Sequence, residues 1–141
     1  MKNYYKPVLA LFVLLFLVLG CSKLKELGDS AGGNKLYFCE SYSSATDKCE
    51  GKSSKYTQGN LTVMVDLRPT KTKLGVTSVN INITNLKSGE VAETYKFDTN
   101  SDMEYIYFDN VKFNETGKFK VSALKPDGTV IVSDEIEIVE N

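Results

Sequence analysis

The chain has no histidine and no tryptophan among its 141 residues, and only three cysteines. Without an imidazole base, the Ser-His-Asp and Cys-His arrangements of nucleophilic enzymes cannot form. Ordinary zinc sites draw on histidine and cysteine and are excluded too, and no glycine-rich phosphate-binding motif occurs. Carboxylate pairs remain, but a small domain without a large cleft gives them no place to cleave a glycosidic bond. We therefore expect no enzyme activity and no resident cofactor.

Charge of neither sign is in large excess, with 17 lysines and arginines against 18 aspartates and glutamates. The basic residues are scattered along the chain. Proteins that bind nucleic acid instead gather positive charge to neutralise phosphates. The composition therefore predicts no nucleic-acid partner.

Only one long hydrophobic run is present, from Val8 to Leu19, and it follows the positive charges of Lys2 and Lys6. As a helix this run spans about 18 Å, short of the roughly 30 Å hydrocarbon core of a bilayer. A charged start followed by a short apolar run is typical of an export signal. The pattern predicts a signal peptide over residues 1–20 rather than a membrane-spanning helix.

The signal ends in residues 18–21, Val-Leu-Gly-Cys, which resemble the lipobox of bacterial lipoproteins, with Leu19 bulkier than the usual residue at its position. The resemblance implies cleavage before Cys21 and attachment of lipid to its thiol. The acyl chains would anchor the protein to a membrane, since each buried methylene contributes about 0.8 kcal/mol. Ser22 follows, rather than the aspartate that retains enteric lipoproteins in the inner membrane, so the analogy favours the outer membrane. The alternative is a cysteine that merely follows an ordinary signal peptide or an uncleaved anchor.

The cysteine count agrees with lipidation, because a lipid on Cys21 leaves Cys39 and Cys49 as a pair. The bacterial periplasm is oxidising, so the pair is expected to form a disulfide. Closing a loop of this length is worth roughly 3 kcal/mol in the loop-entropy estimate. The bridge would hold a polar loop, residues 40–48, after the first strand. The alternative is a two-cysteine metal site, which has no histidine to complete it.

Residues 21–34 are mostly small and polar and predict a flexible tether between lipid and domain. From residue 35 to 141, apolar and polar residues alternate, which predicts strands with one face in a core and one in solvent. Glycine, proline and asparagine turns separate seven such segments. The predicted strands are 35–42, 61–67, 79–84, 91–97, 104–113, 118–123 and 129–139. This pattern indicates one all-β domain, an antiparallel two-sheet sandwich, with a small β-barrel as the alternative.

Residues 115–121, Glu-Thr-Gly-Lys-Phe-Lys-Val, resemble the D-x-G-x-Y-x-C signature at the E–F corner and strand F of immunoglobulin-like domains. Phe119 stands for the tyrosine and Val121 for the cysteine. The resemblance implies an immunoglobulin-like antiparallel β-sandwich of about seven strands, of the kind common on bacterial surface proteins. The whole chain is similar in organisation to small envelope lipoproteins of spirochaetes and related bacteria.

The predicted strand 104–113 carries two tyrosines, Tyr105 and Tyr107, which alternate with Ile106 and Phe108. Because Ile106 and Phe108 fit a core, the tyrosines are expected on the outer face. An exposed tyrosine pair is a plausible contact surface, since tyrosine brings large area at low entropy cost. The alternative is that the two rings cover core residues at the edge of the sandwich.

Oxygen-bearing side chains recur at alternate positions in Asp98, Asn100, Asp102 and Glu104. This spacing resembles the first half of an EF-hand calcium loop. Met103 stands where that loop needs glycine, and the flanks predict strands rather than helices. A solvated polar turn is therefore expected, with a weak calcium site as the alternative.

These features together predict a membrane-anchored cell-envelope lipoprotein whose domain is a non-catalytic binding or adhesion module for host or envelope proteins. The alternative is a periplasm-facing structural subunit of an envelope assembly, which would pair with a partner through an edge strand.

Overall fold

The computed structural model describes residues 33–141. The predicted signal peptide, the predicted lipidation site at Cys21 and most of the predicted tether lie outside the described residues. Within residues 33–141, no helix is long and apolar enough to cross a membrane.

The described chain is built from strands, with one short 3-10 helix (η1, Arg68–Thr70). Seven strands fall on the seven predicted segments, but the first, predicted over 35–42, ends at Cys39, and residues 41–42 belong to β2. Strands β2 to β4 are short and come between the first two of the seven. The strands are β1 (Lys35–Cys39), β2 (Ser41–Ser43), β3 (Lys48–Glu50), β4 (Lys55–Thr57), β5 (Gly59–Asp66), β6 (Ser78–Asn85), β7 (Val91–Asp98), β8 (Tyr105–Phe113), β9 (Gly117–Leu124) and β10 (Val130–Val139).

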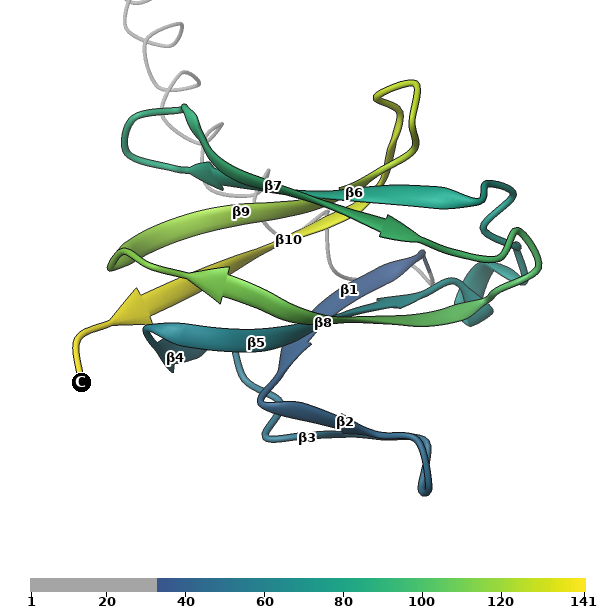
Figure 1. Ribbon diagram of the computed structural model, residues 1–141, viewed down its shortest axis with the longest axis horizontal. Helices are drawn as coiled ribbons and strands as arrows, with labels where there is room; N and C mark the ends of the chain where they lie inside the picture. The colour runs from purple at the N-terminus through teal and green to yellow at the C-terminus, as the bar shows by residue number, and fades with distance from the viewer. Residues whose placement is uncertain (1–32) are drawn as a thin grey trace, which may run out of the picture. The chain divides into compact units, whose positions relative to one another are not determined.

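The strands form two stacked sheets and one hairpin, as Figure 1 shows. One sheet has the order β1-β5-β8, and the other has the order β4-β10-β9-β6-β7. Strands β1, β5 and β8 take the places of immunoglobulin strands A, B and E, while β10, β9, β6 and β7 take those of G, F, C and C′. The predicted immunoglobulin-like sandwich is therefore confirmed. One pair departs from antiparallel order, because β4 runs parallel to β10.

The core lies between the two sheets and is made by the inward-facing residues of the alternating strands. The predicted E–F corner is confirmed, since the chain crosses from one sheet to the other between β8 and β9. Phe119 and Val121 are both buried there, at the positions that the immunoglobulin signature assigns to its tyrosine and cysteine. Gly117 at this corner has a φ of 137°, a backbone conformation that favours glycine.

One sequence expectation is wrong in an informative way. The alternation in β5 predicts that Thr62, Met64 and Asp66 face solvent, yet they are only 3 %, 0 % and 9 % exposed. Asp66 contacts Arg68, whose Nε and Nη2 donate to its carboxylate. For the other two the predicted loop 40–48 is the cause, because β2 and β3 pair as a hairpin that lies outside the three-stranded sheet (Figure 1). Strand β5 is therefore covered on both faces.

Candidate functional site

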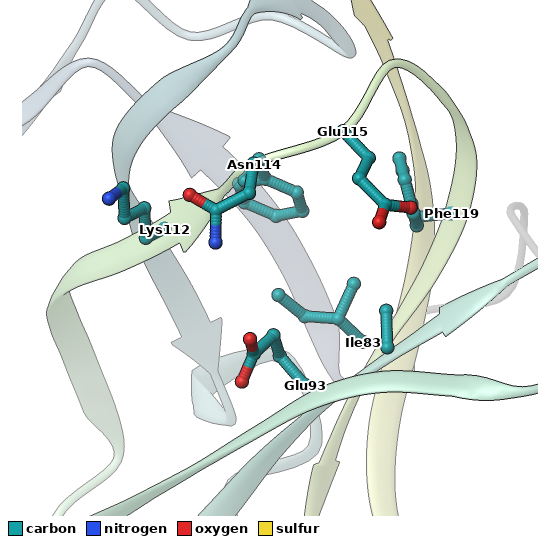
Figure 2. Close-up of a pocket in the computed structure, with 8 residues that line it drawn as sticks. Ile83, Glu93, Lys112, Asn114, Glu115 and Phe119 are labelled. Carbon is teal, nitrogen blue, oxygen red and sulfur yellow. The ribbon is translucent and has the colours of Figure 1, made fainter.

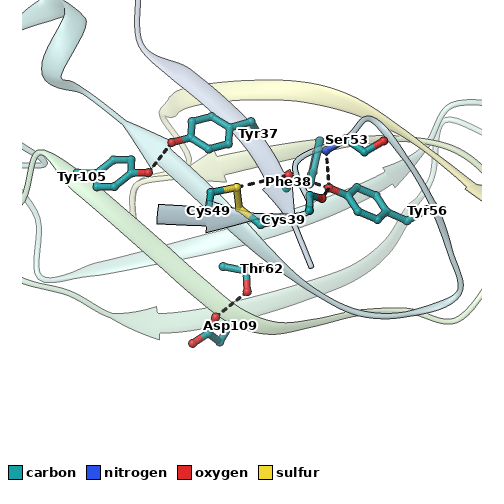
Figure 3. The surroundings of a disulfide bond; sticks show 10 residues. Tyr37, Phe38, Cys39, Cys49, Ser53, Tyr56, Thr62, Tyr105 and Asp109 are labelled. Atoms are coloured by element: carbon teal, nitrogen blue, oxygen red, sulfur yellow. Dashed lines mark hydrogen bonds between the residues drawn. A yellow bond between two sulfur atoms is a disulfide. The ribbon is translucent and has the colours of Figure 1, made fainter. Parts of the chain in front are cut away.

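The hairpin β2–β3 is joined to the sandwich by the predicted disulfide, which the structure confirms. Cys39 ends β1, Cys49 lies in β3, and their Cα atoms are 5.5 Å apart. Cys39 is fully buried, since the hairpin covers it. Figure 3 shows the bridge and the residues around it.

A buried tyrosine holds the segment that leaves the hairpin. The Tyr56 hydroxyl accepts the Ser53 backbone N–H at 2.7 Å and lies 2.8 Å and 2.7 Å from the carbonyl oxygens of Phe38 and Gly51 (Figure 3). Burial raises the pKa of Tyr56, so its hydroxyl stays protonated. The hairpin is thus held to β1 at its base by a covalent and a hydrogen-bonded link.

The hairpin brings a third tyrosine to the pair predicted on β8. The ring of Tyr42 stacks on Tyr107, with centroids 4.3 Å apart and planes at 22°, and meets Tyr105 edge-on at 6.3 Å. Tyr37 of β1 completes the group, with its hydroxyl 2.6 Å from that of Tyr105. We call these four residues the tyrosine surface.

Two cations flank the tyrosine surface. The Arg68 guanidinium lies 3.7 Å from the ring centroid of Tyr105, and Lys52 Nζ lies 4.1 Å from that of Tyr37. Arg68 is itself fixed, because its Nε and Nη2 each donate to the Asp66 carboxylate at 2.8 Å. Cation–π contacts of this kind contribute about 0.5–1 kcal/mol at exposed positions.

The phenols of Tyr37 and Tyr42 are neutral at physiological pH. Burial, followed by the hydrogen bond with Tyr105, raises the pKa of Tyr37 well above its ordinary value. Tyr42 donates to the Asp47 carboxylate, and this bond raises the pKa of Tyr42 to about 12. The arrangement can therefore present aromatic area, hydroxyl groups and two adjacent positive charges to a partner.

The sequence predicts two of the four residues of the tyrosine surface. Tyr105 and Tyr107 lie on the outer face as predicted, with Ile106 and Phe108 buried in the core. Tyr107 is 45 % exposed, whereas Tyr105 is half-buried. Tyr37 was missed although it alternates with Leu36 and Phe38, the same signal that identified the β8 pair.

Two of the four residues of the calcium alternative contact other protein groups through their side chains. Asn100 accepts the Asp102 backbone N–H at 3.0 Å, and Asp102 forms an ion pair with Lys73 at 3.3 Å. Asp98 ends β7, and Glu104 immediately precedes β8. In the part of the chain that the structure describes, no three carboxylate, thiolate or imidazole groups gather to hold a metal ion. The weak calcium site stays an alternative to the predicted polar turn.

Two hollows open where the edge strands β7 and β8 approach each other. Figure 2 shows the first, in which Glu93 and Glu115 stand on opposite sides of a floor that includes Ile83 and Phe119. The second lies beside the tyrosine surface, is open to solvent with a cavity volume of about 240 Å³, and is lined mostly by apolar and aromatic residues. Its lining is Phe97, Asp98, Thr99, Met103, Tyr105, Ile106, Tyr107 and Phe108.

The fold and this surface define an immunoglobulin-like domain with a disulfide-held aromatic hairpin on its outer face. No protein-family model and no curated protein matches the chain. Among solved structures, it is similar to the soluble domain of PmoD from Methylocystis sp. ATCC 49242 (Rockwell). The TM-score is 0.44 at 9 % identity, over 75 % of this chain and 90 % of that one. A likeness this remote says nothing about function.

Proposed function

We propose that the protein is a cell-envelope lipoprotein, anchored through lipid on Cys21 to the outer membrane, whose domain is a non-catalytic binding or adhesion module. The tyrosine surface is its contact face, and host or envelope proteins are its partners. The anchor rests on the lipobox resemblance in residues 18–21.

One observation carries the binding role: the disulfide-held hairpin places Tyr42 on Tyr107 while Tyr107 keeps nearly half of its surface exposed. Tyrosine and arginine are the residue types enriched at the energetic centres of protein interfaces. A covalently fixed hairpin loses little further conformational entropy on association, so its contacts count more fully toward affinity. The hydrophobic core between the two sheets includes none of the four rings of the tyrosine surface, so these rings are not required to complete the core.

Photo-crosslinking in intact cells tests the proposal. A photoreactive phenylalanine analogue is placed at position 107, and as a control at position 130 on β10, where Val130 is 56 % exposed. A distinct protein adduct from position 107 and none from position 130 is expected. Equal adducts from both positions, or none from 107 while the lipoprotein is correctly anchored, would overturn the contact face. Protease treatment of the same cells then separates an outward adhesion module, which is digested, from a protected periplasmic subunit.

A further inference from the structure

Strand β8 offers backbone hydrogen-bonding groups at a free edge next to the tyrosine surface. Its other edge pairs with β5, where Leu67 N–H donates to the Glu104 carbonyl at 2.7 Å. In an antiparallel pair, successive residues direct their N–H and C=O groups alternately to one side and the other. Since the backbone carbonyl of Glu104 points toward β5, the backbone groups of Ile106 and Phe108 point toward β5 as well. The backbone groups of Tyr105 and Tyr107 therefore point away from β5, toward the free edge.

An apolar hollow adjoins this edge. The rings of Phe97 and Phe108 lie 5.0 Å apart, and both line the second hollow together with Ile106. Met103 lines the same hollow and is 41 % exposed. Edge groups that can pair with a strand therefore lie beside a space that can take an apolar side chain.

The available edge is short. Between the pairs Leu61↔Val111 and Val63↔Phe108, β8 has one residue more than β5, and Asn110 in this bulge has a φ of 60°. A bulge bends the strand and ends regular pairing. An added strand therefore has residues 105–108 to pair with, which suits a short extended segment better than a whole sheet.

Carboxylates without an ion-pair partner in the described part of the chain lie along this edge, whereas Arg68 beside Tyr105 is paired with Asp66. Asp98 lines the hollow, Glu104 precedes β8, and Asp109, whose carboxylate accepts a hydrogen bond from the Thr62 hydroxyl of β5, follows residues 105–108. Among residues 33–141, none of these three carboxylates has a lysine or arginine within ion-pair distance. Two copies of this chain meeting at the edge would bring the same acids together, whereas a segment with basic residues would be complementary.

We propose that the free edge of β8 binds an extended segment of a partner protein that carries an apolar residue flanked by lysine or arginine. The segment adds as a strand, with hydrogen bonds to the backbone of Tyr105 and Tyr107, and its apolar side chain enters the hollow beside Phe97 and Met103. This rests on the proposed binding function and deepens it, because it assigns the class of partner.

The test uses the full chain in detergent micelles and a phage-displayed library of random linear peptides. Enriched peptides are expected to share an apolar residue between basic ones. Their affinity should fall at least about tenfold in Tyr107→Pro relative to Tyr107→Ala, because only proline removes the outward N–H. Proline is tolerated at an edge position of this kind. Met103→Lys should weaken binding as strongly, and Val130→Lys, the matched exposed control, should not.

If Tyr107→Pro does not fold, Met103→Lys against Val130→Lys decides the question alone. A library that yields no binders, or binders indifferent to Met103→Lys, overturns the edge proposal and leaves the crosslinking test of the tyrosine surface intact. A concentration-dependent dimer that Met103→Lys dissolves would also overturn it, since the occupant would be a second copy.

Discussion

Replacing both Cys39 and Cys49 with alanine removes the cross-link that holds the hairpin to the sandwich. The bridged cysteines are 10 residues apart in sequence. A loop of this size restricts the unfolded chain by roughly 3 kcal/mol, so the free energy of unfolding should fall by about that amount. The core between the sheets contains neither cysteine, and its packing is unchanged.

The native hairpin should also loosen. Strands β2 and β3 have three residues each, and a two-stranded hairpin of this size is marginal alone. Without the bridge, its main links are the Tyr42–Tyr107 stack, worth about 0.5–1.5 kcal/mol, and the hydrogen bonds of Tyr56. The hairpin should therefore open before the sandwich does, and opening uncovers Met64.

Two measurements check this. Urea unfolding followed by tyrosine fluorescence gives the free energy of unfolding, and hydrogen exchange compares the amides of residues 41–50 with those of β5 and β9. We expect exchange in the hairpin to accelerate while the β9 amides, in the other sheet, stay protected. A loss below about 1 kcal/mol, with the hairpin as protected as in the wild type, would refute the view that the disulfide holds the hairpin.

Three further outcomes are expected. Cys21→Ser should abolish labelling by radioactive palmitate and leave the precursor uncut; a processed, labelled variant would refute lipidation at Cys21. Phe108→Ala should lower the free energy of unfolding by about 3–5 kcal/mol through a core cavity, whereas Tyr107→Ala should lower it by about 1 kcal/mol. Equal losses in urea titrations would contradict the assignment of Phe108 to the core and Tyr107 to the outer face. The hydrogen bonds from Arg68 hold the pKa of Asp66 below its ordinary 3.8. The stabilisation from this pair is therefore present above pH 3.8 and is lost as the pH falls through the folded-state pKa. Arg68→Ala should flatten that part of the profile of unfolding free energy against pH, and an unchanged profile would exclude the pair as its cause.

The seven long strands could be predicted because alternation is a local property of the sequence. In β8, Ile106 and Phe108 lie on the buried face, and Tyr105 and Tyr107 lie on the outer face. The disulfide followed from cysteine parity, and the E–F corner from a short motif ending at Val121. The composite surface could not be predicted in this way. Tyr42 and Tyr107 are far apart in sequence, and only the hairpin, whose strands are too short to show a period, brings them together.

The same reason explains the wrong expectation for β5. Met64 occupies a solvent-facing position in the alternating pattern but is buried. Alternation within one strand contains no information about a distant segment that packs on that strand. A methionine among polar residues on the outer face was the one available signal of a covered surface.

The most direct test of the tyrosine surface is the affinity of the crosslinked partner for purified wild type, Tyr42→Ala and Val130→Ala. Tyr42 does not belong to the core cluster between the sheets, so its loss should leave the sandwich folded. If the hairpin and β8 form one contact face, Tyr42→Ala should weaken binding by about 2 kcal/mol or more, roughly 30-fold, while Val130→Ala binds as the wild type does. Equal affinity of Tyr42→Ala and wild type would contradict it.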